Sequence, residues 1–177
     1  GWVAGNSVVV KVYRPSTGLE YAATATYSAG TGTFGDLFMA VSELELEEPN
    51  PPFYNVDLDW TGVSQLTIFQ DTITGLEIGD EIGIFDSYAL LSSGDCSGLF
   101  GSALVGTGIW TGAQLEVTSI GAVDNCAFGG FQLPGWVAGS SVVVKVYRPS
   151  TDLEYAATAT YSAGTGTFGD LFMAVSE

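Results

Sequence analysis

Carboxylates are the side chains of this chain best suited to chemistry. The densest group lies in the stretches DLDW and GDEIGIFD and consists of Asp57, Asp59, Asp80, Glu81 and Asp86. Hard cations such as calcium take several carboxylate and carbonyl oxygens, so this group is a candidate calcium site. Solvated acidic residues at strand ends are the alternative interpretation. A glycosidase acid pair would also need two carboxylates that face each other across a cleft.

Other catalytic motifs are weak. The chain has no histidine, which excludes Ser–His–Asp and Cys–His arrangements. The stretch GTGTFG (30–35 and 164–169) matches the dinucleotide fingerprint, but a predicted strand follows it where the fingerprint needs a helix. A glycine-rich hairpin loop is therefore the better interpretation. We expect no enzyme activity and no cofactor apart from calcium.

The two cysteines, Cys96 and Cys126, lie 30 residues apart. A zinc site with the usual four ligands is not available from two cysteines and no histidine. The pair predicts a disulfide formed in an oxidising compartment; two buried free thiols are the alternative.

The charge of the chain limits its partners. It carries 20 acidic and 4 basic residues, and residues 44–134 contain no lysine or arginine. Such a surface repels phosphate backbones and anionic lipid headgroups, so we expect no nucleic-acid partner. No stretch resembles a membrane span.

The chain begins with nearly its own ending. Residues 1–43 (the first block) and 135–177 (the second block) align without a gap and differ only at Asn6/Ser140 and Gly18/Asp152. This identity indicates a tandem repeat with a period of 134 residues, which suits whole domains in series better than a solenoid.

Short β-rich segments bounded by turn residues fill the chain. They predict an all-β fold, an antiparallel β-sandwich of jelly-roll or immunoglobulin-like type. The predicted strands are 7–13, 20–27, 35–42, 53–60, 64–71, 81–87, 103–110, 114–120, 126–133, 141–147, 154–161 and 170–176.

An acidic, proline-rich linker is predicted at 44–52. The domain organisation is then a first block, 1–43, that forms the last three strands of a preceding repeat, and a complete domain at 53–177. We call residues 53–134 the middle segment.

The stretches GDEIGIFD (79–86), CSG (96–98) and GWVAGSSVVVKVYRPSTDLEY (135–155) resemble a β-sandwich module of large secreted bacterial proteins, where such modules lie in tandem. The resemblance implies an extracellular or cell-surface location and a subunit of a bacterial fibril. The tripeptide Asp71-Thr72-Ile73 has the form of an O-glycosylation sequence of secreted bacterial proteins, so Thr72 is a candidate glycosylation site.

One block is in excess, because two blocks share one middle segment. We expect the first block to complete a domain of a neighbouring unit by strand complementation, which builds a filament head to tail. Its apolar faces would supply the contacts through Val8, Val10, Val12, Tyr21, Tyr27 and Phe38.

A carbohydrate-binding or adhesive module is the alternative function, and a hydrolase domain is a third. Aromatic side chains could form a sugar-stacking platform, although most aromatics of such folds belong to the core. The candidates are Trp2, Trp60, Trp110, Trp136, Tyr54, Tyr88 and Phe131.

Overall fold

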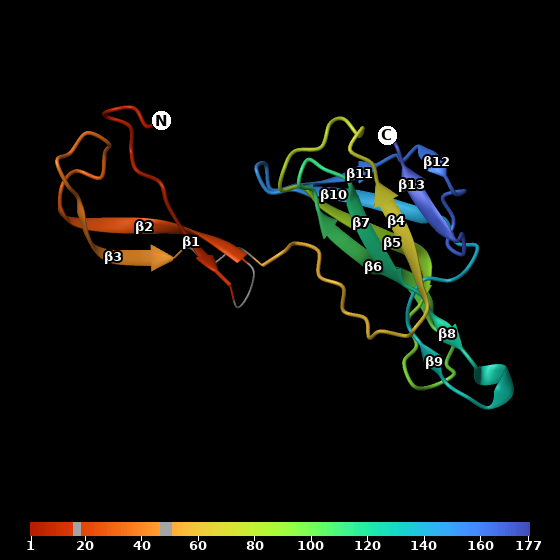
Figure 1. The fold of residues 1–177 in the computed structure, drawn as a ribbon. Coiled ribbons are helices and arrows are strands. Elements are labelled where there is room, and N and C mark those ends of the chain that lie inside the picture. The colour runs from red at the N-terminus through yellow and green to blue at the C-terminus, as the bar shows by residue number, and fades with distance from the viewer. Residues whose placement is uncertain (16–18, 47–50) are drawn as a thin grey trace. The chain divides into compact units, whose positions relative to one another are not determined.

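The computed structural model describes residues 1–15, 19–46 and 51–177. The chain divides into two units, Gly1–Pro51 and Pro52–Glu177 (Figure 1). Each unit is built from β-strands, which confirms the all-β class.

The first unit is one antiparallel sheet in the order β1-β2-β3. Its strands are β1 (Val10–Arg14), β2 (Leu19–Ala29) and β3 (Ala40–Leu46). β3 therefore continues into residues that the sequence assigned to the linker. The reason is local: Leu44, Glu45 and Leu46 alternate in polarity and pair with Ala25, Thr24 and Ala23 of β2.

The second unit contains two four-stranded sheets. One sheet has the order β11 (Leu153–Ala157), β10 (Val142–Arg148), β5 (Glu81–Leu90), β6 (Phe100–Ile109). The other has the order β12 (Tyr161–Ala163), β13 (Phe172–Val175), β4 (Ser64–Phe69), β7 (Leu115–Ile120). Neighbouring strands are antiparallel except for β13 and β4, which run parallel. The expectation of a purely antiparallel arrangement is wrong at that pair.

Both sheets contribute to one hydrophobic core. Ile82, Ile84 and Val144 enter it from the first sheet, and Phe69, Val117 and Val175 from the second. Trp110, Trp136 and Phe168 complete it from the connecting segments. The second block thus supplies a large share of the core.

Two predicted strands are wrong. Residues 53–60 alternate as a strand would, with Tyr54 buried and Asp57 and Asp59 exposed, but they form no ladder with another strand. Residues 126–133 hold a short 3-10 helix, η1 (Cys126–Phe128), and β9 (Gln132–Leu133), which pairs with β8 (Val123–Asp124). Glycine at 129, with φ of 73°, ends the helix.

Among the residues described, no helix is long and apolar enough to cross a membrane.

Candidate functional site

The interface between the second block and the middle segment begins at Gly135. Its backbone exchanges two hydrogen bonds of 3.0 Å with Leu90. Its φ is +155°, and a Cβ atom there would lie 2.4 Å from the carbonyl carbon of Gly121. The backbones approach so closely that only glycine fits at this position.

Trp136 anchors the block. Its indole N–H donates a hydrogen bond of 3.1 Å to the carbonyl of Ser119, and its ring stacks on Phe168 with centroids 5.2 Å apart. Only 6% of Trp136 is exposed. A buried tryptophan whose N–H has a partner is a strong apolar anchor.

Two strands of the block join the sheets of the middle segment. β10 pairs with β5 from Val142 opposite Asp86 to Tyr147 opposite Glu81. β13 pairs with β4 from Phe172 opposite Leu66 to Val175 opposite Phe69. β5 of the middle segment therefore covers one edge of the block, at β10, and β4 covers the other, at β13.

Buried polar side chains recognise the backbone of the block. The carboxylate of Asp86, fully buried, accepts hydrogen bonds of 2.8 Å from the N–H groups of Tyr88 and Val137. The amide oxygen of Gln65 accepts a bond of 2.6 Å from the N–H of Gly169. Such bonds offset the cost of burying these polar groups and select one register of the block.

An ion pair closes the opposite end of the interface. Arg148 donates to both carboxylate oxygens of Asp80, at 3.0 and 2.7 Å, and to the carbonyl of Gly75 at 2.7 Å. Burial alone would raise the pKa of Asp80, but the hydrogen bonds from Arg148 and from the backbone of Glu77, with the charge of Arg148, hold that pKa below its ordinary value. No sequence pattern predicts this pair, because its members lie 68 residues apart.

The five predicted calcium ligands do not gather at one site. Asp57 and Asp59 are exposed, while Asp80 and Asp86 have the partners described above. Glu81 accepts hydrogen bonds from the N–H groups of Phe53 and Tyr54, at 3.1 and 3.0 Å. Within the described ranges, no three acidic or cysteine side chains gather to hold a metal ion. Calcium binding stays a prediction from the sequence, and this placement does not favour it.

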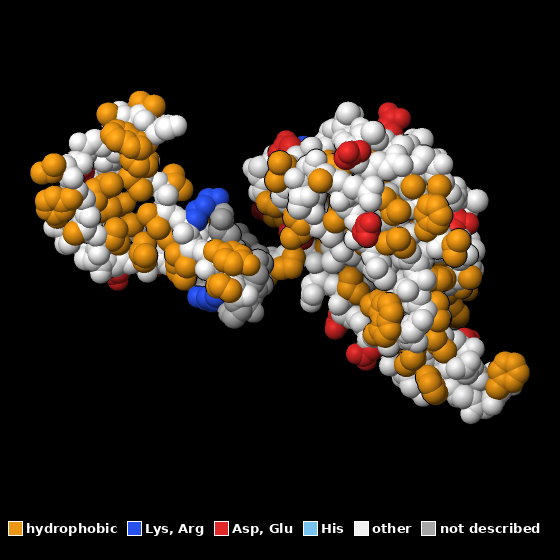
Figure 2. All heavy atoms as spheres, viewed as in Figure 1, with side chains coloured by type: hydrophobic (Ala, Val, Ile, Leu, Met, Phe, Trp, Pro, Cys, Tyr) orange, Lys and Arg blue, Asp and Glu red, His pale blue; other side chains and the backbone are white. Residues whose placement is uncertain are grey.

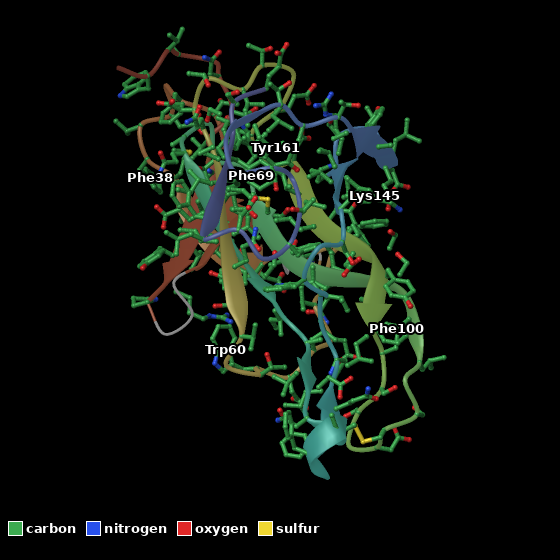
Figure 3. All side chains as sticks on the ribbon, turned by 90° about the vertical axis from the view of Figure 1, so that its right-hand side faces the viewer. Phe38, Trp60, Phe69, Phe100, Lys145 and Tyr161 are labelled. Carbon is green, nitrogen blue, oxygen red and sulfur yellow. A yellow bond between two sulfur atoms is a disulfide. The ribbon has the colours of Figure 1, made fainter. Side chains whose placement is uncertain are left out.

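The disulfide between Cys96 and Cys126 is confirmed, with Cα atoms 5.9 Å apart. Figure 3 shows it as a yellow bond beside η1. Thr72, the candidate glycosylation site, is exposed, and its hydroxyl donates a bond of 3.3 Å to the carbonyl of Ser176. Its glycosylation remains a prediction.

The aromatic residues do not share one surface. Tyr54, Trp110 and Trp136 are buried, whereas Trp2, Trp60, Tyr88 and Phe131 are exposed. Tyr88 stacks on Phe100 with centroids 4.7 Å apart. The alternative interpretation, a sugar-stacking platform, does not include all seven side chains, because three of them are buried in the second unit.

The first block exposes many residues that the second block buries. Trp2 is 65% exposed against 6% for Trp136, and Val41 is 46% exposed against 3% for Val175. Val10 and Val12 are half-buried where their equivalents Val144 and Val146 are buried. Phe38 is exposed and Val8 and Tyr27 are half-buried, as are their equivalents in the second block. Figure 2 shows apolar side chains gathered on the visible face of this unit. Tyr21 differs from the other predicted assembly residues, since it is buried within the described part of the chain.

Comparison of the chain with protein-family models, with curated proteins and with solved structures returned no match.

Proposed function

We propose that this protein is a non-enzymatic structural subunit of an extracellular filament or surface array. Units of β-sandwich type would join head to tail by strand complementation, with the first block completing the domain of a neighbouring unit. One observation carries the proposal: the first block exposes Trp2 and Val41, whose equivalents Trp136 and Val175 in the nearly identical second block are buried against the middle segment.

The strand order supports this proposal. β1 and β3 lie at the two edges of the first sheet, whereas their equivalents β10 and β13 are inner strands flanked by β5 and β4. An edge strand is a template for further pairing. The middle segment of a neighbouring unit, in the same chain or another, would supply the equivalents of β4 and β5.

Two further features support the proposed location and the proposed shape of the assembly. The disulfide is typical of proteins that fold in an oxidising compartment. A contact between the first block of one unit and the middle segment of the next is heterologous, so it propagates into a filament unless the rotation between units closes a ring. This agrees with the fibril that the resemblance implies.

Competition between the blocks makes the proposal testable. The second block occupies the middle segment of its own chain, so a first block from another copy must displace it. Weakening the second block should therefore promote assembly, and weakening the first block should prevent it.

The experiment compares Val144→Asp with Val10→Asp by sedimentation velocity and negative-stain microscopy. Val144 is buried beside β5, so Val144→Asp should free the middle segment and increase self-association. Val10→Asp should reduce self-association, and the double variant should lose it as well. Val9→Asp is the matched control, because Val9 is exposed and its equivalent Val143 is also exposed.

Two results would overturn the proposal. In one, Val144→Asp associates equally with and without Val10→Asp, which would indicate aggregation of an unfolded unit. In the other, Val10→Asp and Val9→Asp associate as the unaltered chain does.

A further inference from the structure

A cleft of about 270 Å³ opens between the two sheets of the second unit. Its apolar wall comes from both sheets and from the 73–76 loop, and includes Phe69, Ile73, Leu76, Ile82, Val144 and Val146. Residues 157–159, Val175 and Glu177 also line the cleft. Figure 3 labels Phe69 and Tyr161, which pack in the same core at this end of the unit.

The pairing of β13 with its neighbour ends beside this cleft. Tyr161 lies opposite Val175, and the last bonds join Thr160 to Glu177 and Ser176 to Thr160, at 2.8 and 2.9 Å. Residues 158–160 separate β11 from β12 and belong to neither strand. The cleft is therefore lined in part by residues between β11 and β12 that belong to no strand.

The equivalent ladder of the first unit goes further. β3 continues beyond Glu43, and Leu44, Glu45 and Leu46 pair with Ala25, Thr24 and Ala23. β2 is accordingly one unbroken strand of 11 residues. In the first unit, residues 44–46 extend β3 and β2 is continuous. In the second block, the equivalent of β2 is divided into β11 and β12.

In the first unit, the register places two leucines opposite the equivalents of two residues that line the cleft. Residues opposite each other in an antiparallel ladder point to the same face. Leu44 lies opposite Ala25 and Leu46 opposite Ala23. The second-block equivalents of these alanines are Ala159 and Ala157, and both line the cleft.

Residues beside the cleft are more exposed than their equivalents in the first unit. Tyr21 is 4% exposed, whereas its equivalent Tyr155, which also lines the cleft, is 41% exposed. Ala23 is half-buried and its equivalent Ala157 is exposed. The second unit is the larger one, yet Tyr155 and Ala157 of β11 are more exposed than the equivalent residues of β2.

We propose that the cleft is a docking site for an extended Leu-Glu-Leu segment joined to Glu177, which continues β13 as residues 44–46 continue β3. The two leucines fill the cleft, and the glutamate between them faces away from it. The site is separate from strand complementation, because it lies within one unit and can be filled whether or not the first block finds a partner.

The test adds a copy of residues 44–49, Leu-Glu-Leu-Glu-Glu-Pro, after Glu177 of the full chain. One control tail is Ser-Glu-Ser-Glu-Glu-Pro, with the same charge. The second control inserts one serine before the leucine tail, since a slip of one residue turns both leucines to the solvent face. All three are made in the Val10→Asp variant, so that self-association through the first block does not contribute.

The leucine tail should raise Tm by about 5 °C or more over both controls, as expected for two newly buried leucine side chains. It should also slow hydrogen exchange of the backbone amides in 157–159 by at least about tenfold. Equal Tm values for the three tails, or protection that leaves 157–159 unchanged, would refute the docking site and leave the proposed assembly untouched.

Discussion

The first and second blocks are the same 43-residue sequence, apart from two positions, in two surroundings. Part of their local structure is the same, although β2 is one continuous strand where the second block has the two short strands β11 and β12. Val10 lies opposite Ala23 as Val144 lies opposite Ala157, and the N–H of Thr31 donates to Asp36 at the distance, 2.6 Å, at which Thr165 donates to Asp170.

Their burial and outer pairings differ. Trp2 stacks on Phe34 much as Trp136 stacks on Phe168, but only the second pair lies in a core. The hairpin, the turn and the ring stack are thus properties of the block alone. The covering of its apolar face is a property of the middle segment.

We expect the largest difference between the two blocks for alanine substitution of their equivalent tryptophans, Trp136 and Trp2. Removing the buried indole should lower the free energy of unfolding of the second unit by about 3–5 kcal/mol. Trp2→Ala should change it by less than about 0.5 kcal/mol, because Trp2 is mostly exposed. Denaturant unfolding of both variants measures the difference; equal losses would mean that the two blocks are equally covered in solution.

The close backbone approach at Gly135 has no counterpart at Gly1, its equivalent in the first block, and alanine substitution at the two positions tests this difference. A Cβ at position 135 meets the backbone of Gly121 and Ala122, so the second unit should lose about 2–3 kcal/mol of stability. At Gly1 no described atom lies within 4 Å of such a Cβ, and we expect no change. Thermal unfolding gives both values, and a tolerated alanine at 135 would show that the close approach is absent.

The smallest effect concerns pH. The pKa of Asp80 is depressed in the folded unit, so its contribution to stability is complete above the ordinary carboxyl pKa, about 3.9, and is lost as the pH falls through the folded value. A tenfold difference in proton affinity between the folded and unfolded states corresponds to about 1.4 kcal/mol. The stability difference between the unaltered chain and Asp80→Asn should therefore shrink in acid. Urea titrations at pH 7 and below pH 4 measure it, and a constant difference would argue against the ion pair.

Much of the second unit was predictable from alternating residues. The segments 64–71, 81–87, 103–110 and 114–120 were predicted as strands and contain β4, β7 and most of β5 and β6. The segment 53–60 alternates equally well and still forms no strand, because alternation reports which side chains face the core and not whether a neighbouring backbone is available. The disulfide needed no topology, since two cysteines allow one intramolecular pairing.

The sequence alone predicts most strands of the second unit and contains the near-identity of the two blocks, because alternation and identity are read from the residues without knowledge of their partners. Only the tertiary structure decided that β13 runs parallel to β4, that Arg148 meets Asp80, and that Trp136 is buried while Trp2 is exposed. Each of these depends on partners that are distant in the sequence. The two blocks have nearly the same sequence, so the difference in their burial comes from the middle segment, which packs against the second block.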